Sequence, residues 1–292
     1  MSKIICVVGP TGVGKTELSL TLAKKYNASI INADATQIYK EANIGTAKIT
    51  KEEQLDIKHY MLDIVDLDKD YTVMDYQRDG RAIINKLICK NENIVIVGGS
   101  GLYIKALLYN YKFDKEEKLN YDFSSLTNEE LKEKVDEIYK ENQIHVNNRK
   151  RLERFLTHYY VTGNIIKNSK EKDKLLYNVI MIGLTANKEE LNNYLDKRIN
   201  NMIYNGLIEE TCNLKEYPKL ETFIGYKEIL DYKNKKTDLR SAMEEILKRT
   251  KKYAKRQYTW FNNQFDNIQW FKINYKNFNE TEKKVIEYIE NL

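Results

Sequence analysis

The chain has 292 residues, of which 42% are hydrophobic and 11% aromatic, enough for a sizeable core and too much for global disorder. Its formal net charge of +5 makes a nucleic-acid partner admissible only if the charge is clustered. No apolar run approaches the roughly 18 residues that span a bilayer, and none near the N-terminus suits a secretory signal. The three cysteines lack the spacing of a zinc site or a disulfide scaffold. We therefore expect a cytoplasmic protein that has no membrane segment.

Strands and helices are expected to alternate along most of the chain. Apolar runs predict strands at 4–8, 29–33, 60–65, 94–97, 177–184 and 268–271. Helical spacing predicts helices at 17–26, 73–87, 102–108, 189–205 and 243–261. This order predicts an α/β fold of the P-loop NTPase-like kind, a parallel sheet flanked by helices. The continuous apolar strands are typical of a sheet that is covered on both faces.

The texture of the sequence changes in the middle of the chain. Charged and asparagine residues dominate there, and the apolar residues Leu126, Leu131, Val135 and Ile138 follow helical spacing. We predict a smaller all-helical insertion domain at 113–175 within a catalytic core formed by 1–112 and 176–292.

A phosphate-binding motif follows the first predicted strand. Residues 9–16 fit the pattern G-x-x-x-x-G-K-S/T, whose backbone N–H groups cradle a di- or triphosphate. In this pattern the lysine supplies positive charge and the last hydroxyl can hold Mg²⁺, the cofactor that we expect at Thr16. The candidate diphosphate ligands in this loop are Gly9, Thr11, Gly12, Val13, Gly14, Lys15 and Thr16. The acidic residue that usually ends a central strand in ATPases is missing after 94–97, where Gly98-Gly99-Ser100 stands instead.

Two polar residues are expected at the edge of the sheet where such folds bind ligands. Asp34 follows the second predicted strand and Ser100 follows the strand at 94–97. Asp34 could act as a general base or hold Mg²⁺ through water. Each residue also has a purely structural interpretation, an Asx turn or helix N-cap for Asp34 and an N-cap for Ser100.

Positive charge gathers in two segments. Lys150, Arg151 and Arg154 lie close together on one predicted helix. Residues 248–261 carry six positive charges and no negative ones, with Arg249, Lys252 and Arg256 on one helical face. An outward basic stripe of this kind suits a nucleic-acid backbone. The alternative is a solvated surface helix without a partner.

In combination, these motifs resemble the tRNA dimethylallyltransferases (tRNA isopentenyltransferases, or IPP transferases) of the bacterial type. The segments that carry the resemblance run in the family's order at 9–16, 34–39, 44–48, 63–66, 97–103, 151–154, 224–228 and 253–261. The resemblance implies transfer of a dimethylallyl group from dimethylallyl diphosphate to N6 of adenosine 37, next to the anticodon, with release of diphosphate. The expected partners are therefore this donor and a tRNA anticodon stem-loop, bound by a monomer.

The resemblance also implies roles for individual residues. Asp34 would be the general base, while Ser100, where the family often has threonine, and Lys15 would act on the leaving diphosphate, which Arg198 would also bind. Gln37 would read the adenine edge, and Ala35 stands where serine is common. The implied tRNA-contacting set is Asp34, Ala35, Thr36, Gln37, Ser100, Lys150, Arg151, Arg154, Arg249, Lys252 and Arg256.

Three other functions remain open from the sequence. A small-molecule P-loop kinase would use ATP and would not need the basic segment at 248–261. A non-enzymatic RNA-binding protein would keep the phosphate loop as a relic. A prenyltransferase acting on free adenosine nucleotides would share the donor site but not the basic helices.

Overall fold

The computed structural model describes residues 2–113, 121–165, 174–215 and 217–292. It divides into two compact units, Met1–Tyr109 with Leu175–Leu292, and Asn110–Lys174. The sequence placed the insertion at 113–175. Within the described residues, no helix is both long and apolar enough to cross a membrane.

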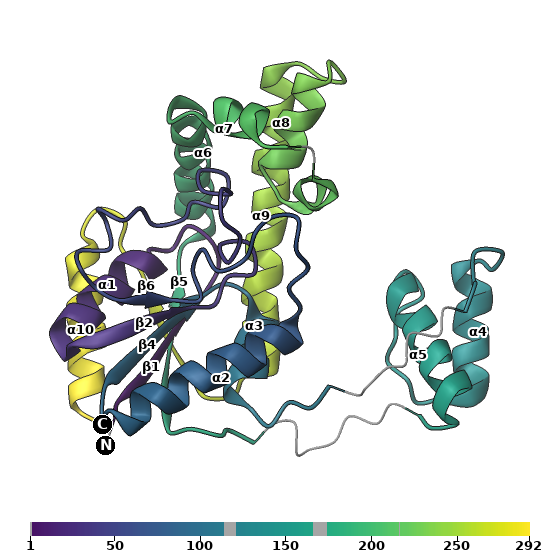
Figure 1. Ribbon diagram of the computed structural model, residues 1–292, viewed down its shortest axis with the longest axis horizontal. Helices are drawn as coiled ribbons and strands as arrows, with labels where there is room; N and C mark the ends of the chain where they lie inside the picture. The colour runs from purple at the N-terminus through teal and green to yellow at the C-terminus, as the bar shows by residue number, and fades with distance from the viewer. Residues whose placement is uncertain (1, 114–120, 166–173, 216) are drawn as a thin grey trace. The chain divides into compact units, whose positions relative to one another are not determined.

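A parallel sheet forms the centre of the first unit (Figure 1). Within the described ranges its six strands lie in the order β3-β2-β4-β1-β5-β6. Their bounds are β1 Ile4–Val8, β2 Ala28–Asn32, β3 His59–Tyr60, β4 Asn93–Gly98, β5 Val179–Thr185 and β6 Ile268–Lys272. In register, Val8 lies opposite Gly98 on one side and Gly183 on the other, so β1 and β4 end together while β5 continues to Thr185. This common end places the loops that follow β1 and β4 side by side.

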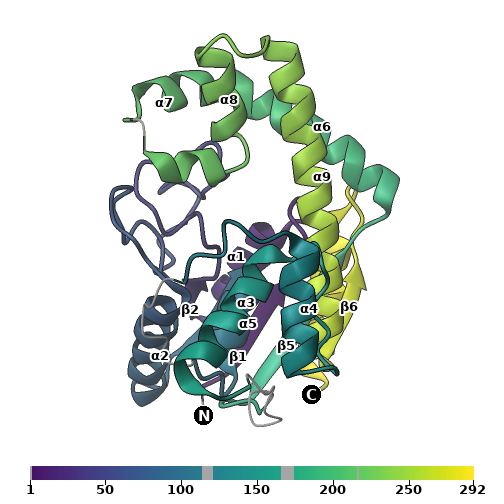
Figure 2. The same cartoon turned by 90° about the vertical axis from the view of Figure 1, so that its right-hand side faces the viewer.

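The helices of the first unit surround this sheet. Their bounds are α1 Lys15–Tyr26, α2 Val73–Cys89, α3 Gly101–Leu108, α6 Lys188–Tyr204, α7 Leu207–Asn213, the 3₁₀ helix η2 Pro218–Thr222, α8 Tyr226–Lys233, α9 Leu239–Gln264 and α10 Phe278–Glu290. Polar caps begin several of them: Thr72 and Asp75 form a capping box on α2, and the Asp238 side chain accepts from the Ser241 N–H of α9. Figures 1 and 2 show α6, α7 and α8 grouped beside α9.

Both faces of the sheet are buried, as the apolar strands predicted. One face packs on α1 and α10 through Ile5, Val7, Leu18 and Val285. The other face packs on α2, α3 and α9, whose core residues include Tyr76, Ile104 and Phe261. The six-stranded parallel sheet between helical layers confirms the predicted fold class.

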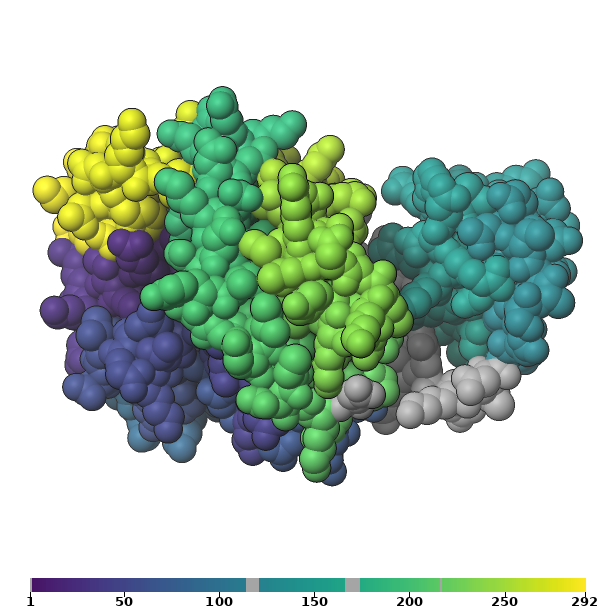
Figure 3. Space-filling model, turned by 90° about the horizontal axis from the view of Figure 1, so that it is seen from above, coloured from purple at the N-terminus to yellow at the C-terminus, as the bar shows by residue number. Residues whose placement is uncertain are grey.

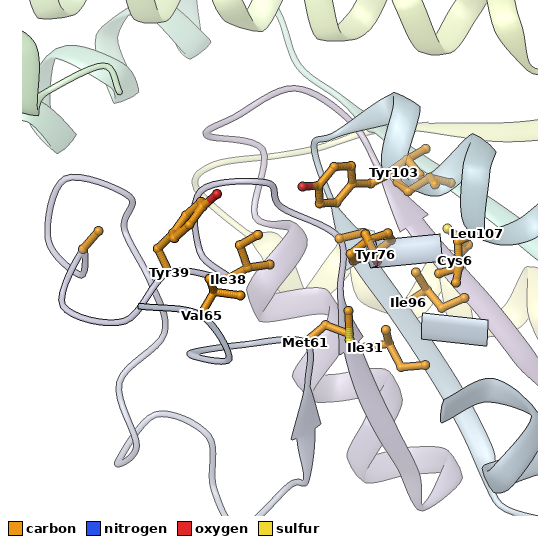
Figure 4. Packing of buried hydrophobic residues seen from close by; sticks show 14 of the residues in the cluster. Cys6, Ile31, Ile38, Tyr39, Met61, Val65, Tyr76, Ile96, Tyr103 and Leu107 are labelled. Carbon is orange, nitrogen blue, oxygen red and sulfur yellow. The ribbon is translucent and has the colours of Figure 1, made fainter. Parts of the chain in front are cut away.

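A buried cluster supports the segment that follows β2 (Figure 4). Tyr76 stacks on Tyr103, with ring centroids 4.2 Å apart, and its hydroxyl donates to the carbonyl of Asn32 at 2.8 Å. Ile38 and Tyr39 are buried in the same cluster. The segment between Asn32 and Ile38 is therefore anchored at both ends by core contacts.

The second unit contains α4 Asn128–Ile138 and α5 Arg149–Thr162. They share a small core in which Leu131, Val135, Leu152 and Leu156 are fully buried. The described residues of this unit contain these two helices and no strand.

Several element predictions needed correction. The strand predicted at 60–65 shrinks to His59–Tyr60, because Met61 and Asp63 adopt left-handed φ values of 59° and 53° that end the strand. The predicted helix at 243–261 extends to Leu239–Gln264. The helices α7, α8 and α10 had no counterpart in the predicted elements.

Candidate active site

A cavity of about 460 Å³ lies in the first unit, where β1, β2 and β4 end. Its lining comes from the phosphate loop, the segment after β2, the loop at 45–49, the turn after β4, and helices α6 and α9. In Figure 3 the surface of α6 to α9, in green, adjoins blue and purple surface from the first third of the chain. The cavity therefore joins parts of the chain that are far apart in sequence.

The phosphate loop has the geometry that its glycines predicted. Gly12 and Gly14 have φ values of 88° and 77°, in the left-handed region that L residues with a side chain rarely adopt. Gly14 is the N-cap of α1, so the loop presents the first N–H groups of that helix to the cavity. Thr16, in the first turn of α1, is exposed and lines the cavity.

Lys15 is held inside this loop. Its Nζ donates to the carbonyl of Pro10 at 2.6 Å. Burial lowers the pKa of Lys15 to about 7, a shift that the charge of Asp34 opposes and that of Arg198 reinforces. An anion bound here would supply the missing negative charge and favour the protonated amine.

Arg198 faces the same cavity from α6. Burial lowers its pKa, against the opposing effects of Tyr194 and Asp34. The three predicted residues Lys15, Asp34 and Arg198 thus line one cavity. Two half-buried basic side chains and one carboxylate meet there.

Asp34 lies just beyond β2 and lines the cavity. Its Oδ1 accepts from the N–H of Thr36 at 2.9 Å and from the Thr36 hydroxyl at 2.7 Å. This is the Asx turn of the structural interpretation, and the carboxylate still faces the cavity. The two interpretations of Asp34 are therefore compatible.

Ser100 occupies the N-cap position of α3 but makes no capping hydrogen bond. Its Oγ instead accepts from the N–H of Ala35 at 2.9 Å. Among the described residues, Gly98 and Gly99 line the cavity and Ser100 does not. Ser100 thus supports the segment beside Asp34 from behind.

Gln37 lines the cavity and holds a neighbouring loop. Its Nε2 donates to the carbonyls of Thr46 at 3.0 Å and Ala47 at 3.3 Å. Glu210 fixes the start of the same loop by accepting from the N–H groups of Ile44 and Gly45. Glu210 was not predicted as a site residue, because it lies outside the segments that carry the family resemblance.

The motif at 224–228 explains the position of this loop. The hydroxyl of Tyr226 donates to Glu210 at 2.5 Å. A Cβ atom on Gly45 would lie 2.3 Å from the Tyr226 ring, so this position admits only glycine without a shift of the ring. The glycine and tyrosine of the two motifs therefore form one packed contact.

The basic residues of α9 do not form the single outer stripe that was predicted. Arg249 and Arg256 line the cavity, whereas Lys252 is exposed and is not part of the lining formed by the described residues. Arg249 forms an ion pair with Glu228, whose side chain is only 4% exposed. The prediction of an outward-facing Arg249 is wrong, because helical spacing shows which residues share a face but not what covers it.

The other basic cluster belongs to the second unit. Lys150, Arg151 and Arg154 are exposed on α5. They belong to the second unit, whereas the cavity residues belong to the first.

Three residues of the predicted phosphate-binding set are engaged inside the protein. Gly9 and Val13 are buried and do not line the cavity within the described part of the chain. The N–H of Thr11 donates to Oε1 of Gln257 at 2.8 Å, so it is already engaged inside the protein. Gln257 and Tyr253 both line the cavity, and neither was predicted as a site residue although both belong to the motif at 253–261.

Two oxygen-bearing side chains in the cavity lining fit the expected Mg²⁺ ion. Within the described residues, no group of three or more His, Cys, Asp or Glu side chains could hold a metal ion by itself. Mg²⁺ usually takes one or two protein oxygens and completes its shell with water and substrate phosphate. The exposed hydroxyl of Thr16 and the carboxylate of Asp34, both in the cavity lining, fit that pattern.

Comparison with known proteins gives consistent matches. The family model described as IPP transferase matches residues 37–264. A tRNA dimethylallyltransferase of Bacillus mycoides (strain KBAB4) is 37% identical over 99% of this chain and 94% of its own. One from Acholeplasma laidlawii (strain PG-8A) is 41% identical over 90% of each chain.

Solved structures resemble the fold over its full length. A tRNA delta(2)-isopentenylpyrophosphate transferase of Staphylococcus epidermidis has a TM-score of 0.74 and 32% identity, covering 100% of both chains. A eukaryotic dimethylallyltransferase acting on tRNA has a TM-score of 0.81 and 26% identity, covering 100% of this chain and 80% of its own.

Proposed function

Because the chain belongs to the IPP transferase family, we propose that it transfers a dimethylallyl group from dimethylallyl diphosphate to N6 of adenosine 37 in tRNA. The observation that carries this proposal is that residues of the phosphate loop, Arg198 and Asp34 line one and the same cavity. Cations for a leaving diphosphate and a carboxylate for a departing proton are the two groups that this reaction needs. The kinase alternative is not favoured, since the relatives are named as transferases that act on tRNA.

The donor would bind through its diphosphate. Lys15, Arg198 and the N–H groups at the start of α1 face the cavity and carry the charge that a diphosphate complements. Thr16, with Asp34 nearby, would hold a Mg²⁺ ion that neutralises developing charge on the leaving group. The apolar lining residues Leu195, Ile199 and Met202 give the five-carbon tail a dry surface.

The chemical step forms one bond and breaks another. The N6 nitrogen of adenosine bonds to the first carbon of the dimethylallyl group as that carbon's bond to the bridging oxygen breaks. The diphosphate leaves with the electron pair, and the N6 proton passes to Asp34. An exocyclic purine amine is a poor nucleophile, and proton removal by a placed base typically gains about 10²–10⁴-fold in rate.

The acceptor would enter from the side formed by α9 and the loop at 45–49. Arg249 and Arg256 add positive charge to the cavity on this side. A base in an anticodon loop costs less to extrude than a base in a duplex, which suits a buried site. The exposed Lys150, Arg151 and Arg154 of the second unit would bind the tRNA backbone. We propose that the chain acts on tRNA as a monomer and in the cytoplasm.

The test is a turnover assay on unmodified tRNA. Purified protein is incubated with Mg²⁺ and dimethylallyl diphosphate, and the digested RNA is searched by mass spectrometry for N6-dimethylallyladenosine. Parallel reactions supply ATP in place of the donor, or AMP in place of tRNA. Product only with tRNA and donor supports the proposal. Consumption of ATP alone, or product with AMP alone, would overturn it.

A further inference from the structure

Gln257 is a buried polar residue in the middle of the basic segment of α9. Its side chain is 5% exposed, while its neighbours Arg256 and Tyr258 are exposed. Burying an amide is costly unless both of its halves find hydrogen-bond partners. An apolar side chain could fill the same position without a desolvation penalty. The hydrogen-bond partners of Gln257 therefore indicate its role.

The amide of Gln257 joins two loops. Its Oε1 accepts from the N–H of Thr11 in the phosphate loop at 2.8 Å, and its Nε2 donates to the carbonyl of Gly99 at 3.0 Å. Only one orientation of the amide satisfies a backbone donor on one side and a backbone acceptor on the other. A Cβ atom on Gly99 would lie 2.1 Å from Nε2, so the glycine makes room for this contact.

Tyr253 lies beside this connection, one turn of the helix away. It is four residues before Gln257 on the same face and lines the cavity with it. Burial raises the pKa of Tyr253, and the neighbouring side chains of Ser100 and Gln257 oppose that shift. Ser100 in turn accepts from the N–H of Ala35 at 2.9 Å. The connection thus runs from Thr11 through Gln257 to Gly99, and from Ser100, the next residue in the chain, to Ala35, the residue after Asp34.

The two ends of this network are the two reacting sides of the proposed site. The phosphate loop would hold the donor, and the segment at 34–37 holds the carboxylate for the acceptor. Transfer needs the reacting atoms aligned at about 3–3.5 Å, so a small change in the separation of the two loops would lower the rate of transfer strongly.

We propose that Gln257 and Tyr253 are positioning residues that hold the phosphate loop and the Asp34 segment at the separation required for transfer, an inference that rests on the proposed function. They act through Thr11, Gly99 and Ser100. The inner face of α9 therefore aligns the donor and acceptor sides of the site.

The test uses Gln257→Met and Tyr253→Phe, which keep the size of each side chain and remove its polar group. We expect each variant to lower kcat on tRNA by about tenfold, the rate factor that corresponds to the free energy of roughly one hydrogen bond. The KM for tRNA should stay within about twofold, because the proposed role is alignment for the chemical step and not RNA binding. Tyr258→Phe, an exposed tyrosine on the same helix, is the matched control and should match the wild type.

The double variant separates a network from two independent packing effects. A single network predicts that Gln257→Met with Tyr253→Phe loses about as much kcat as the worse single variant. A loss equal to the product of the two single losses would overturn the proposal. So would unchanged kcat in both single variants, or a rise in KM for tRNA without a change in kcat.

Binding of inorganic diphosphate, measured by calorimetry, does not depend on turnover. Gln257→Met should weaken it by about fivefold, because Thr11 loses its anchor, whereas Tyr253→Phe should leave it unchanged. A wild type that binds diphosphate but makes no product would contradict the proposed function alone. Equal diphosphate affinity in the wild type and Gln257→Met would contradict the positioning role alone.

Discussion

Asp34 carries the sharpest prediction at the scale of single residues. Its carboxylate lines the cavity, and both of its described side-chain hydrogen bonds go to Thr36 within the same turn. Asp34→Asn keeps the size of the side chain but cannot take a proton. We expect kcat to fall by about 10²–10⁴-fold, with the Kd for tRNA nearly unchanged. Single-turnover kinetics and filter binding measure the two quantities, and an equal loss in both would refute the general-base role.

Lys15 predicts how donor binding depends on pH. Burial lowers its pKa to about 7 in the ligand-free protein, and a bound diphosphate would raise it. Below pH 7 the amine is protonated before and after binding, so affinity does not change through this group. Above pH 7 binding must take up a proton, and the Kd for the donor should rise by up to about tenfold per pH unit. Titration calorimetry between pH 7 and 8.5 measures this slope.

Lys15→Met provides the control for that slope. It lacks the titrating amine, so its weaker donor binding should not vary with pH over the same range. A slope that persists in this variant would mean that another group takes up the proton.

Residue patterns in the sequence identified the cavity residues that lie next to a strand end. Asp34 lies in the segment after β2, and Lys15 and Thr16 begin α1 after the loop that follows β1. Parallel strands bring such segments to one edge of the sheet. Gln257 and Glu210 could not be found this way, because their partners lie in distant loops. Periodicity fixes which face of a helix a side chain occupies, but it does not say which loop lies opposite that face.

At the scale of elements, the ion pair between Arg249 and Glu228 joins α9 to α8. The Glu228 side chain is 4% exposed and also accepts from the N–H of Gly225 at 2.8 Å. Glu228→Ala leaves a partly buried guanidinium and a backbone donor without their acceptor. We expect the free energy of unfolding to fall by about 2–3 kcal/mol in denaturant titrations.

Glu244→Ala is the comparison for this change. Glu244 pairs with Arg240 on the same helix α9, but the two side chains are 66% and 90% exposed. Exposed pairs contribute little, so this variant should unfold almost as the wild type does. Similar losses in both variants would mean that burial does not set the strength of the α8–α9 link.

Elements with strong periodicity were predicted close to their true ends. The strand expected at 94–97 is β4 Asn93–Gly98, and the helix expected at 73–87 is α2 Val73–Cys89. The short helix α7 was missed because seven residues give too few turns to show a period. For α10 the apolar residues Val285 and Ile289 were present, and the missing information was that α1 and the sheet would bury them.

At the scale of the whole molecule, the second unit leaves and rejoins the first at one point. Tyr109 and Leu175 form an antiparallel bridge, flanked by a hydrogen bond from the N–H of Leu176 to the carbonyl of Leu108. Residues 110–174 can therefore be replaced by a two-residue hairpin turn such as Asn-Gly without stretching the chain. We expect this variant to keep its diphosphate affinity. It should lose most of its activity on tRNA, because Lys150, Arg151 and Arg154 are removed with the second unit.

Calorimetry with diphosphate and the turnover assay measure these two outcomes. A folded variant that no longer binds diphosphate would show that the second unit contributes to the donor site. A variant with full activity on tRNA would show that the basic residues of α5 are dispensable.

The order of the sheet also sets a timetable for synthesis. β1 emerges first but has β5 as one of its two neighbours, and the whole of 110–174 is made before β5. At about 5–20 residues per second, a ribosome needs about 3 to 13 s for that stretch. During this interval one edge of the central strand Ile4–Val8 waits unpaired, and such edges can pair with the wrong strand. The nascent chain therefore carries one open edge on its central strand from the time that β4 is made until β5 follows.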